Sequence, residues 1–169
     1  MASLIRECSK IKRKHEFKTK IVADGGFKKF SDIIKALALG SDYVMLGGII
    51  NKSLESSSPC YSKSNIDGYS EINVEEAKKL MGRGETVYKY FRGMSTKEVQ
   101  SKWGREKLKT AEGISKYNKV EYSIESWVNN FEDYLKSNMS YCNKRSLEEY
   151  IGEVKFRFMT PEAYARFNK

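Results

Sequence analysis

The chain has 169 residues, of which 40% are hydrophobic, and its 31 basic and 22 acidic side chains give a formal net charge of +9. This length allows a globular domain with a buried core but falls short of the ~250 residues of a complete eight-stranded β/α barrel. No apolar run approaches the ~20 residues of a membrane-spanning helix, and an acid at Glu7 interrupts the N-terminal stretch. Neither a membrane span nor a secretory signal is therefore expected.

Cysteine and charge narrow the possible environments and partners. Three widely spaced cysteines and a single histidine form no disulfide framework and no zinc spacing, so we expect a cytoplasmic protein without a metal site. The positive charge favours anionic partners, either a small phosphate or a polymer. The densest basic stretch, 10–20, offers only Phe17 as an interleaved aromatic side chain, so we expect a solvated helix end and loop there rather than a nucleic-acid patch.

The first 50 residues predict a βαβ unit. Helical spacing over 3–12 is followed by apolar runs at 20–23 and 43–46, and each run stops at a glycine pair. Between the runs lies a helical pattern with Ser31 as its N-cap and Gly40 in the C′ position. The order strand, glycine pair, helix, strand, glycine pair implies two parallel strands.

The middle of the chain reads as more irregular. Residues 51–69 are rich in Ser and Asn and predict a surface loop or insertion. Asn73 with Glu76, and Ser95 with Glu98, predict capping boxes that open two helices, the first of which ends at Gly82 or Gly84. Further predictions are an edge-like strand at 87–91 and a polar flap at 104–117.

The last part of the chain is predicted to be mostly helical. An amphipathic helix is expected from Ser123, with Trp127 on its apolar face. Ser146 with Glu149 caps a short helix, and Thr160-Pro161 starts another. A strand is expected at 155–159. We divide the chain into four segments: 1–50 with the phosphate-binding loops, 51–87 as an insertion with a short helix, 88–122 as a nucleotide-contacting strand and flap, and 123–169 as C-terminal helices and tail.

The two glycine pairs are candidate phosphate loops. Glycines at the carboxyl ends of parallel strands let backbone amides approach an anion closely, and in β/α barrels the phosphate site is often built from the loops after the last two strands. Asp24 directly precedes Gly25 and Gly26 and is placed to reach ribose hydroxyls, while Gly47 and Gly48 follow the second run. Two tight turns without a ligand remain the alternative.

Three stretches together resemble the IMP dehydrogenase/GMP reductase family: 21–48, the Tyr-Phe-Arg-Gly-Met-Ser segment at 90–95, and Ala-Glu-Gly at 111–113. The short spacing from Gly93 to Gly113 is similar to that of GMP reductases. The resemblance implies an α/β fold, namely the C-terminal portion of a (β/α)8 TIM barrel with its last strands, flap and C-terminal helices, incomplete as a barrel on its own.

The resemblance also implies roles for matching positions. Glu112 corresponds to the flap glutamate that assists proton transfer, and Tyr141 to a residue that contacts the cofactor NADPH. The remaining matches would bind the purine mononucleotide: Asp24, Gly25, Gly26, Gly47, Gly48, Gly93, Met94, Ser95, Lys109 and Gly113. The family's cysteine nucleophile lies in a Gly-Ser-x-Cys-Thr-Thr loop, which this sequence does not contain.

Three hypotheses about the function of the chain follow. The first is a GMP reductase-type oxidoreductase, converting GMP and NADPH to IMP and ammonia, in which this chain supplies the phosphate site and flap but not the nucleophile. The alternative is a non-catalytic nucleotide-binding fragment or split subunit, or a piece of an IMP dehydrogenase-type enzyme. A basic nucleic-acid-associated protein is the third. A complementary chain or a second copy is expected to cover the open barrel edge.

Overall fold

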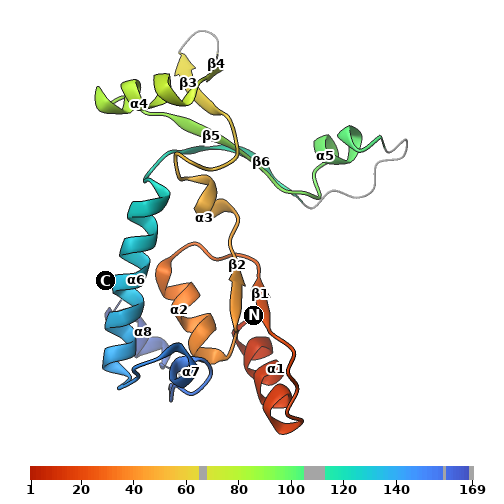
Figure 1. Ribbon diagram of the computed structural model, residues 1–169, viewed down its shortest axis with the longest axis vertical. Coiled ribbons are helices and arrows are strands. Elements are labelled where there is room, and N and C mark those ends of the chain that lie inside the picture. Colours follow the sequence, from red (N-terminus) through yellow and green to blue (C-terminus); the bar gives the residue numbers. More distant parts are fainter. Residues whose placement is uncertain (65–67, 105–112, 158, 168–169) are drawn as a thin grey trace. The chain divides into compact units, whose positions relative to one another are not determined.

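The computed structural model describes residues 1–64, 68–104, 113–157 and 159–167 (Figure 1). These residues form two compact units. The first unit combines Met1–Asp24, Ser31–Met45 and Leu135–Lys169, and the second combines Gly25–Phe30 and Leu46–Tyr134. No helix in the described ranges is both long enough and apolar enough to cross a membrane.

The first unit is built around a pair of short parallel strands. Its elements are α1 (Ala2–Lys14), β1 (Val22–Asp24), α2 (Phe30–Leu39), β2 (Tyr43–Met45), the C-terminal part of α6 (Ile124–Tyr141), α7 (Leu147–Tyr150) and α8 (Pro161–Phe167). Strand β1 pairs with β2 in parallel, from Val22 opposite Tyr43 to Asp24 opposite Met45. The predicted βαβ unit is therefore confirmed.

Helix α2 buries the apolar face that the sequence predicted and ends at the predicted glycine. Ile33 and Leu37 are buried, and Gly40 has a φ of +110°. The Gly40 amide donates to the carbonyl of Leu37 and the Ser41 amide to that of Ala36, the bond pattern of a Schellman motif. The predicted N-cap at Ser31 is wrong, because the helix already begins at Phe30.

Asp42 ties α1 to the two strands. Its carboxylate accepts from Lys12 Nζ at 2.7 Å, from the Ile21 amide at 2.7 Å and from Lys20 Nζ at 3.5 Å. Burial opposes ionisation of this group, but the amide and the two ammonium groups outweigh it and lower the pKa of Asp42 below its ordinary value. Lys12 and Lys20 thus bind Asp42 within the first unit. Part of the basic stretch at 10–20 is therefore engaged in the fold itself.

Tyr150 closes this unit from the C-terminal side. Its side chain is 1% exposed, and its hydroxyl donates to Asn138 Oδ1 on α6 at 2.6 Å. The hydroxyl also lies 3.4 Å from the carbonyl of Ile34 on α2. Burial, with a smaller contribution from Cys142, raises the pKa of Tyr150 to about 12. One buried ring therefore joins three helices of the unit.

The second unit is built on an antiparallel sheet. Its elements are α3 (Gly48–Asn51), β3 (Cys60–Ser64), β4 (Gly68–Ile72), α4 (Val74–Gly82), β5 (Tyr88–Arg92), α5 (Lys97–Lys102), β6 (Ser115–Lys119) and the N-terminal part of α6. The strand order is β4-β3-β5-β6, with every neighbouring pair antiparallel. Cys60, Ala77 and Val87 form its buried apolar cluster.

This sheet corrects three predictions. Residues 51–69 are not only a loop, since 60–64 forms β3. Strand β5 is an inner strand between β3 and β6 rather than an edge strand. The segment predicted as a flap contains β6 at its C-terminal end. The physical reason is common to all three: these strands carry many polar side chains and owe their stability to pairing with distant strands.

The predicted helix starts are mostly confirmed. Asn73 caps α4 by accepting from the Glu76 amide at 2.8 Å, and Ser146 caps α7 by accepting from the Glu149 amide at 3.3 Å. Helix α6 begins after Ser123, and α8 begins at Pro161, as predicted. Two predictions are wrong: Thr96, not Ser95, caps α5, and the described residues of 155–159 form no strand.

Candidate functional site

The first glycine pair follows β1 directly. Asp24 is the last residue of β1 and is exposed. Gly25 and Gly26 have φ values of +114° and +79°, a conformation that favours glycine. A β-carbon on Gly26 would have no atom within 4 Å, so the space beside this residue is open. This loop therefore has the backbone geometry and the accessibility that close approach of a ligand requires.

The second glycine pair lies against the aromatic ring of Phe91. Gly47 is the N-cap of α3 and Gly48 is its first residue. A β-carbon would lie 3.9 Å from the Phe91 ring if built on Gly47 and 4.0 Å from it if built on Gly48. Phe91 belongs to β5 and stands two residues before Gly93. The fold of the second unit thus brings the Gly47–Gly48 turn close to the strand that leads into the Gly-Met-Ser segment.

The Gly-Met-Ser segment at 93–95 contacts the end of the predicted flap. The Gly93 amide donates to the carbonyl of Ile114 at 3.1 Å. A β-carbon on Gly113 would lie 2.9 Å from Ser95 Oγ and 2.9 Å from the Thr96 nitrogen. No side chain fits at Gly113 without displacing backbone. Gly93, Ser95 and Gly113, separated by up to 20 positions in the sequence, therefore form one cluster in the second unit.

The basic residue nearest this cluster in the sequence is already paired. Arg92 donates to Glu98 Oε1 at 2.8 Å, and the Tyr90 hydroxyl donates to Glu98 Oε2 at 2.9 Å. The bond from Tyr90, followed by that from Arg92, lowers the pKa of Glu98. The guanidinium of Arg92 is therefore engaged by Glu98 beside this cluster.

Of the other predicted site residues, Met94 stands between Gly93 and Ser95, Tyr141 belongs to the first unit, and two fall outside the described residues. Met94 is 66% exposed. Tyr141 is the last residue of α6 and is 88% exposed. Lys109 and Glu112 fall in 105–112, outside the described residues.

Three residues that sequence reasoning did not select lie beside the second glycine pair or contact the helix turn that it starts. Phe91 contacts it, as described above. Asn51, at the end of α3, accepts from the Asn118 side chain at 2.9 Å. Phe91 belongs to the 90–95 motif, so the motif gave a signal for it. Nothing in the sequence marks Asn118, because its importance comes from the pairing of β5 with β6, which the sequence pattern did not predict.

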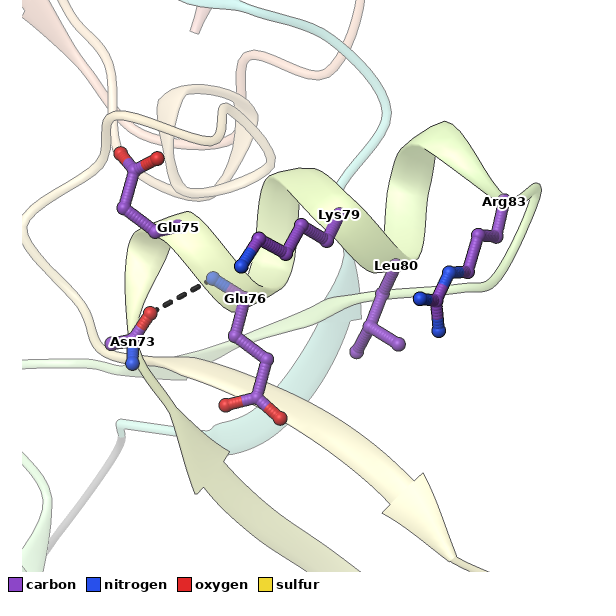
Figure 2. Close-up of a pocket in the computed structure, with 6 residues that line it drawn as sticks. All are labelled: Asn73, Glu75, Glu76, Lys79, Leu80 and Arg83. Carbon is purple, nitrogen blue, oxygen red and sulfur yellow. Dashed lines mark hydrogen bonds between the residues drawn. The ribbon is translucent and has the colours of Figure 1, made fainter.

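A hollow of about 440 Å³ lies elsewhere in the second unit, along α4. Figure 2 shows its lining, together with the capping bond from the Glu76 amide to Asn73. The lining residues come only from α4 and its two ends: Asn73, Glu75, Glu76, Lys79, Leu80 and Arg83. None of them is a predicted site residue. Within the described ranges, no group of three or more His, Cys, Asp or Glu side chains is arranged to hold a metal.

Comparison with known proteins agrees with the resemblance. The inosine-5'-monophosphate dehydrogenase of Cryptosporidium parvum is 32% identical over 155 residues, covering 86% of this chain and 33% of that protein. The enzyme of the same name from Bacillus subtilis is 32% identical over 163 residues, covering 92% of this chain and 29% of that protein. Human GMP reductase 2 is 25% identical over 169 residues, covering 99% of this chain and 42% of that protein.

The fold agrees as well. The crystal structure of GMP reductase C318A from Trypanosoma brucei, in complex with guanosine 5'-monophosphate, superposes with a TM-score of 0.74 at 24% identity. The match covers 99% of this chain and 31% of that one. The chain therefore has an α/β fold similar to part of that enzyme. It spans between 29% and 42% of the length of the three curated relatives named above.

The strongest evidence covers nearly the whole sequence. The profile of the IMP dehydrogenase/GMP reductase domain matches residues 2–166. The chain belongs to the IMP dehydrogenase/GMP reductase family.

Proposed function

We propose that this chain binds the phosphate and ribose of a purine mononucleotide and forms the C-terminal part of a GMP reductase-type oxidoreductase. The observation that carries the proposal is the closeness of the Gly47–Gly48 turn to Phe91 of β5, the strand that leads into Gly93 and its neighbour Gly113, in a chain that belongs to this family. Exposed glycine amides bind anions without a positively charged side chain. The complete enzyme would convert GMP and NADPH to IMP and ammonia.

Each part of the proposed site has a chemical task. The amides of Gly25, Gly26, Gly47 and Gly48 would hold the phosphate, and the carboxylate of Asp24 would accept bonds from the ribose hydroxyls. Glu112 would assist proton transfer, and Lys109 would lie near the nucleotide. A thiolate must form the covalent purine adduct, and the family's cysteine loop does not occur in this sequence. Residues outside this chain would supply that nucleophile, and the chain alone is expected to bind GMP without converting it.

NADPH is the cofactor that the resemblance implies, and Tyr141 is the described residue assigned to it. One ring that is 88% exposed offers a dinucleotide no enclosure, and the Tyr141 side chain alone holds none of its phosphates. Tyr141 by itself therefore does not form a binding site for NADPH. NADPH stays a prediction for the complete enzyme.

An IMP dehydrogenase-type enzyme is the second candidate. The two relatives at 32% identity are inosine-5'-monophosphate dehydrogenases, whereas the short spacing from Gly93 to Gly113 favours the reductase. Because GMP and IMP share the same ribose and phosphate, turnover of GMP with NADPH, measured with the missing barrel portion added, discriminates between them.

The open face of β1 and β2 favours a covering partner. Val22, Tyr43 and Met45 are 51%, 57% and 54% exposed, although their side chains are large and apolar. Residues that alternate on paired strands share one face of the pair, so these three line a single face. We propose that either a complementary chain with the remaining strands of the barrel or a second copy of this chain covers it. A cytoplasmic location likewise stays a prediction.

Asp24→Ala is expected to weaken GMP binding about 10- to 100-fold, because charge-assisted bonds to the ribose would be lost. Titration calorimetry of the chain with GMP and with IMP measures the effect. The matched control is Asp133→Ala, which removes an exposed aspartate on α6 and should leave the affinity for GMP unchanged. Equal affinity of the Asp24 variant and the wild-type chain would remove Asp24 from the site.

A further inference from the structure

We propose that Asn118 is a positioning residue, which fixes the Gly47–Gly48 turn relative to Gly93 through Asn51. The inference rests on the proposed function, in which these glycines contact the nucleotide phosphate. Asn118 itself would not touch the ligand. Its role would be to keep constant the spacing between two parts of one anion site.

Hydrogen bonds between side chains and the backbone form a continuous series across the second unit. Asn118 lies in β6, is 8% exposed and pairs with Lys89 of β5. Its Nδ2 donates to Asn51 Oδ1 at 2.9 Å. The Asn51 Nδ2 in turn donates to the carbonyl of Tyr90 at 3.4 Å. One side-chain pair therefore connects α3 with both β5 and β6.

This series of hydrogen bonds is connected to Gly47 at one end and to Gly93 at the other. The Asn51 amide donates to the carbonyl of Gly47 at 3.1 Å, so Asn51 and Gly47 close a single helical turn. Tyr90 stands three residues before Gly93 on the same strand and its continuation. A displacement of Asn51 would therefore displace the Gly47–Gly48 turn relative to Gly93.

Other bonds support the same stretch but act at different points. Lys89 Nζ donates to the carbonyls of Ser56 and Ser58, which hold the segment after α3. The Tyr122 hydroxyl donates to the carbonyl of Ile49 inside α3. Because Tyr122 remains in place when Asn118 is changed, we expect the turn to loosen rather than unfold.

The test compares ligands that differ only in the phosphate. Asn118→Leu replaces the amide with an apolar group of similar size and leaves Asn51 Oδ1 without its donor. We expect the dissociation constant for GMP to rise about tenfold, while that for guanosine changes less than about twofold. Asn51→Ala breaks the same link from the other side and should give the same pattern. Asn129→Leu, at an exposed position on α6, is the control.

Hydrogen exchange supplies a readout that does not need the ligand. Exchange at the amides of 47–51 should accelerate at least fivefold in Asn118→Leu, while exchange in α2 stays unchanged. Equal weakening of GMP and guanosine, or unchanged exchange at 47–51, would overturn the positioning role. A wild-type chain that binds no GMP would instead overturn the proposed function, and exchange would still decide whether Asn118 holds the turn.

Discussion

Replacing Gly40 with alanine is expected to lower the free energy of unfolding by roughly 2–4 kcal/mol. Two separate costs add up at this position. The φ of +110° is one that side chains rarely adopt. A β-carbon there would also lie 2.1 Å from Ser9 Oγ and 2.5 Å from Ser9 Cβ, and Ser9 is a buried residue of α1. Urea denaturation followed by circular dichroism measures the loss.

Gly82 offers a matched control for this substitution. It is the last residue of α4, and a β-carbon on it would meet nothing within 4 Å. Gly82→Ala should therefore raise the free energy of unfolding by about 0.5–1 kcal/mol, through the better helix propensity of alanine. If Gly40→Ala proved as stable as the wild-type chain, the end of α2 would not be packed against α1 as described.

Tyr150→Ala is expected to cost roughly 3–5 kcal/mol, because it removes a ring that is 1% exposed from the core of the first unit. Tyr150→Phe keeps the ring and should cost roughly 1–3 kcal/mol, since Asn138 Oδ1 then loses its donor. Tyr141→Ala, at a tyrosine that is 88% exposed, should change stability by less than about 0.5 kcal/mol. Denaturant unfolding of the three variants provides the comparison.

The raised pKa of Tyr150 predicts that the free energy of unfolding depends on pH in the alkaline range. Its pKa is about 12 in the folded chain, against about 10 in an unfolded one. A group whose pKa is higher in the folded state stabilises that state fully at pH values below its unfolded pKa. This stabilisation is lost as the pH rises through the folded pKa. Between pH 10 and 12 the wild-type chain should therefore lose more stability than Tyr150→Phe. Parallel loss in the two proteins would show that the Tyr150 hydroxyl is not buried.

Local signals predicted the first unit well. The apolar periodicity of α2, its glycine at position 40 and the two runs around 22 and 44 are properties of neighbouring residues, so sequence alone reveals them. Asn73 and Ser146 identified helix starts for the same reason, since a cap acts on amides three residues away. Ser31 and Ser95 were misplaced as caps because serine also occurs inside the first turn or just before the cap.

The second unit depends on distant pairings that no local pattern carries. Cys60 pairs with Ile72 and also with Lys89, and Lys89 pairs with Asn118. These strands contain serine, lysine and asparagine, so their sequences resemble loops, and only the four-stranded arrangement makes them strands. The same division applies to the candidate site. Its glycines stand out in the sequence, whereas Asn118, which we propose as the residue that positions the Gly47–Gly48 turn, does not.

The central claim, that the glycine turns of this chain bind a purine nucleotide phosphate, is tested most directly by nuclear magnetic resonance of the 19.5 kDa chain. Titration of the isotope-labelled protein with GMP should shift the amide signals of Gly25, Gly26, Gly47, Gly48 and Gly93 in a saturable way. Guanosine at the same concentration should shift them far less. Unchanged signals at these glycines, or shifts confined to the basic end of α1, would contradict the account.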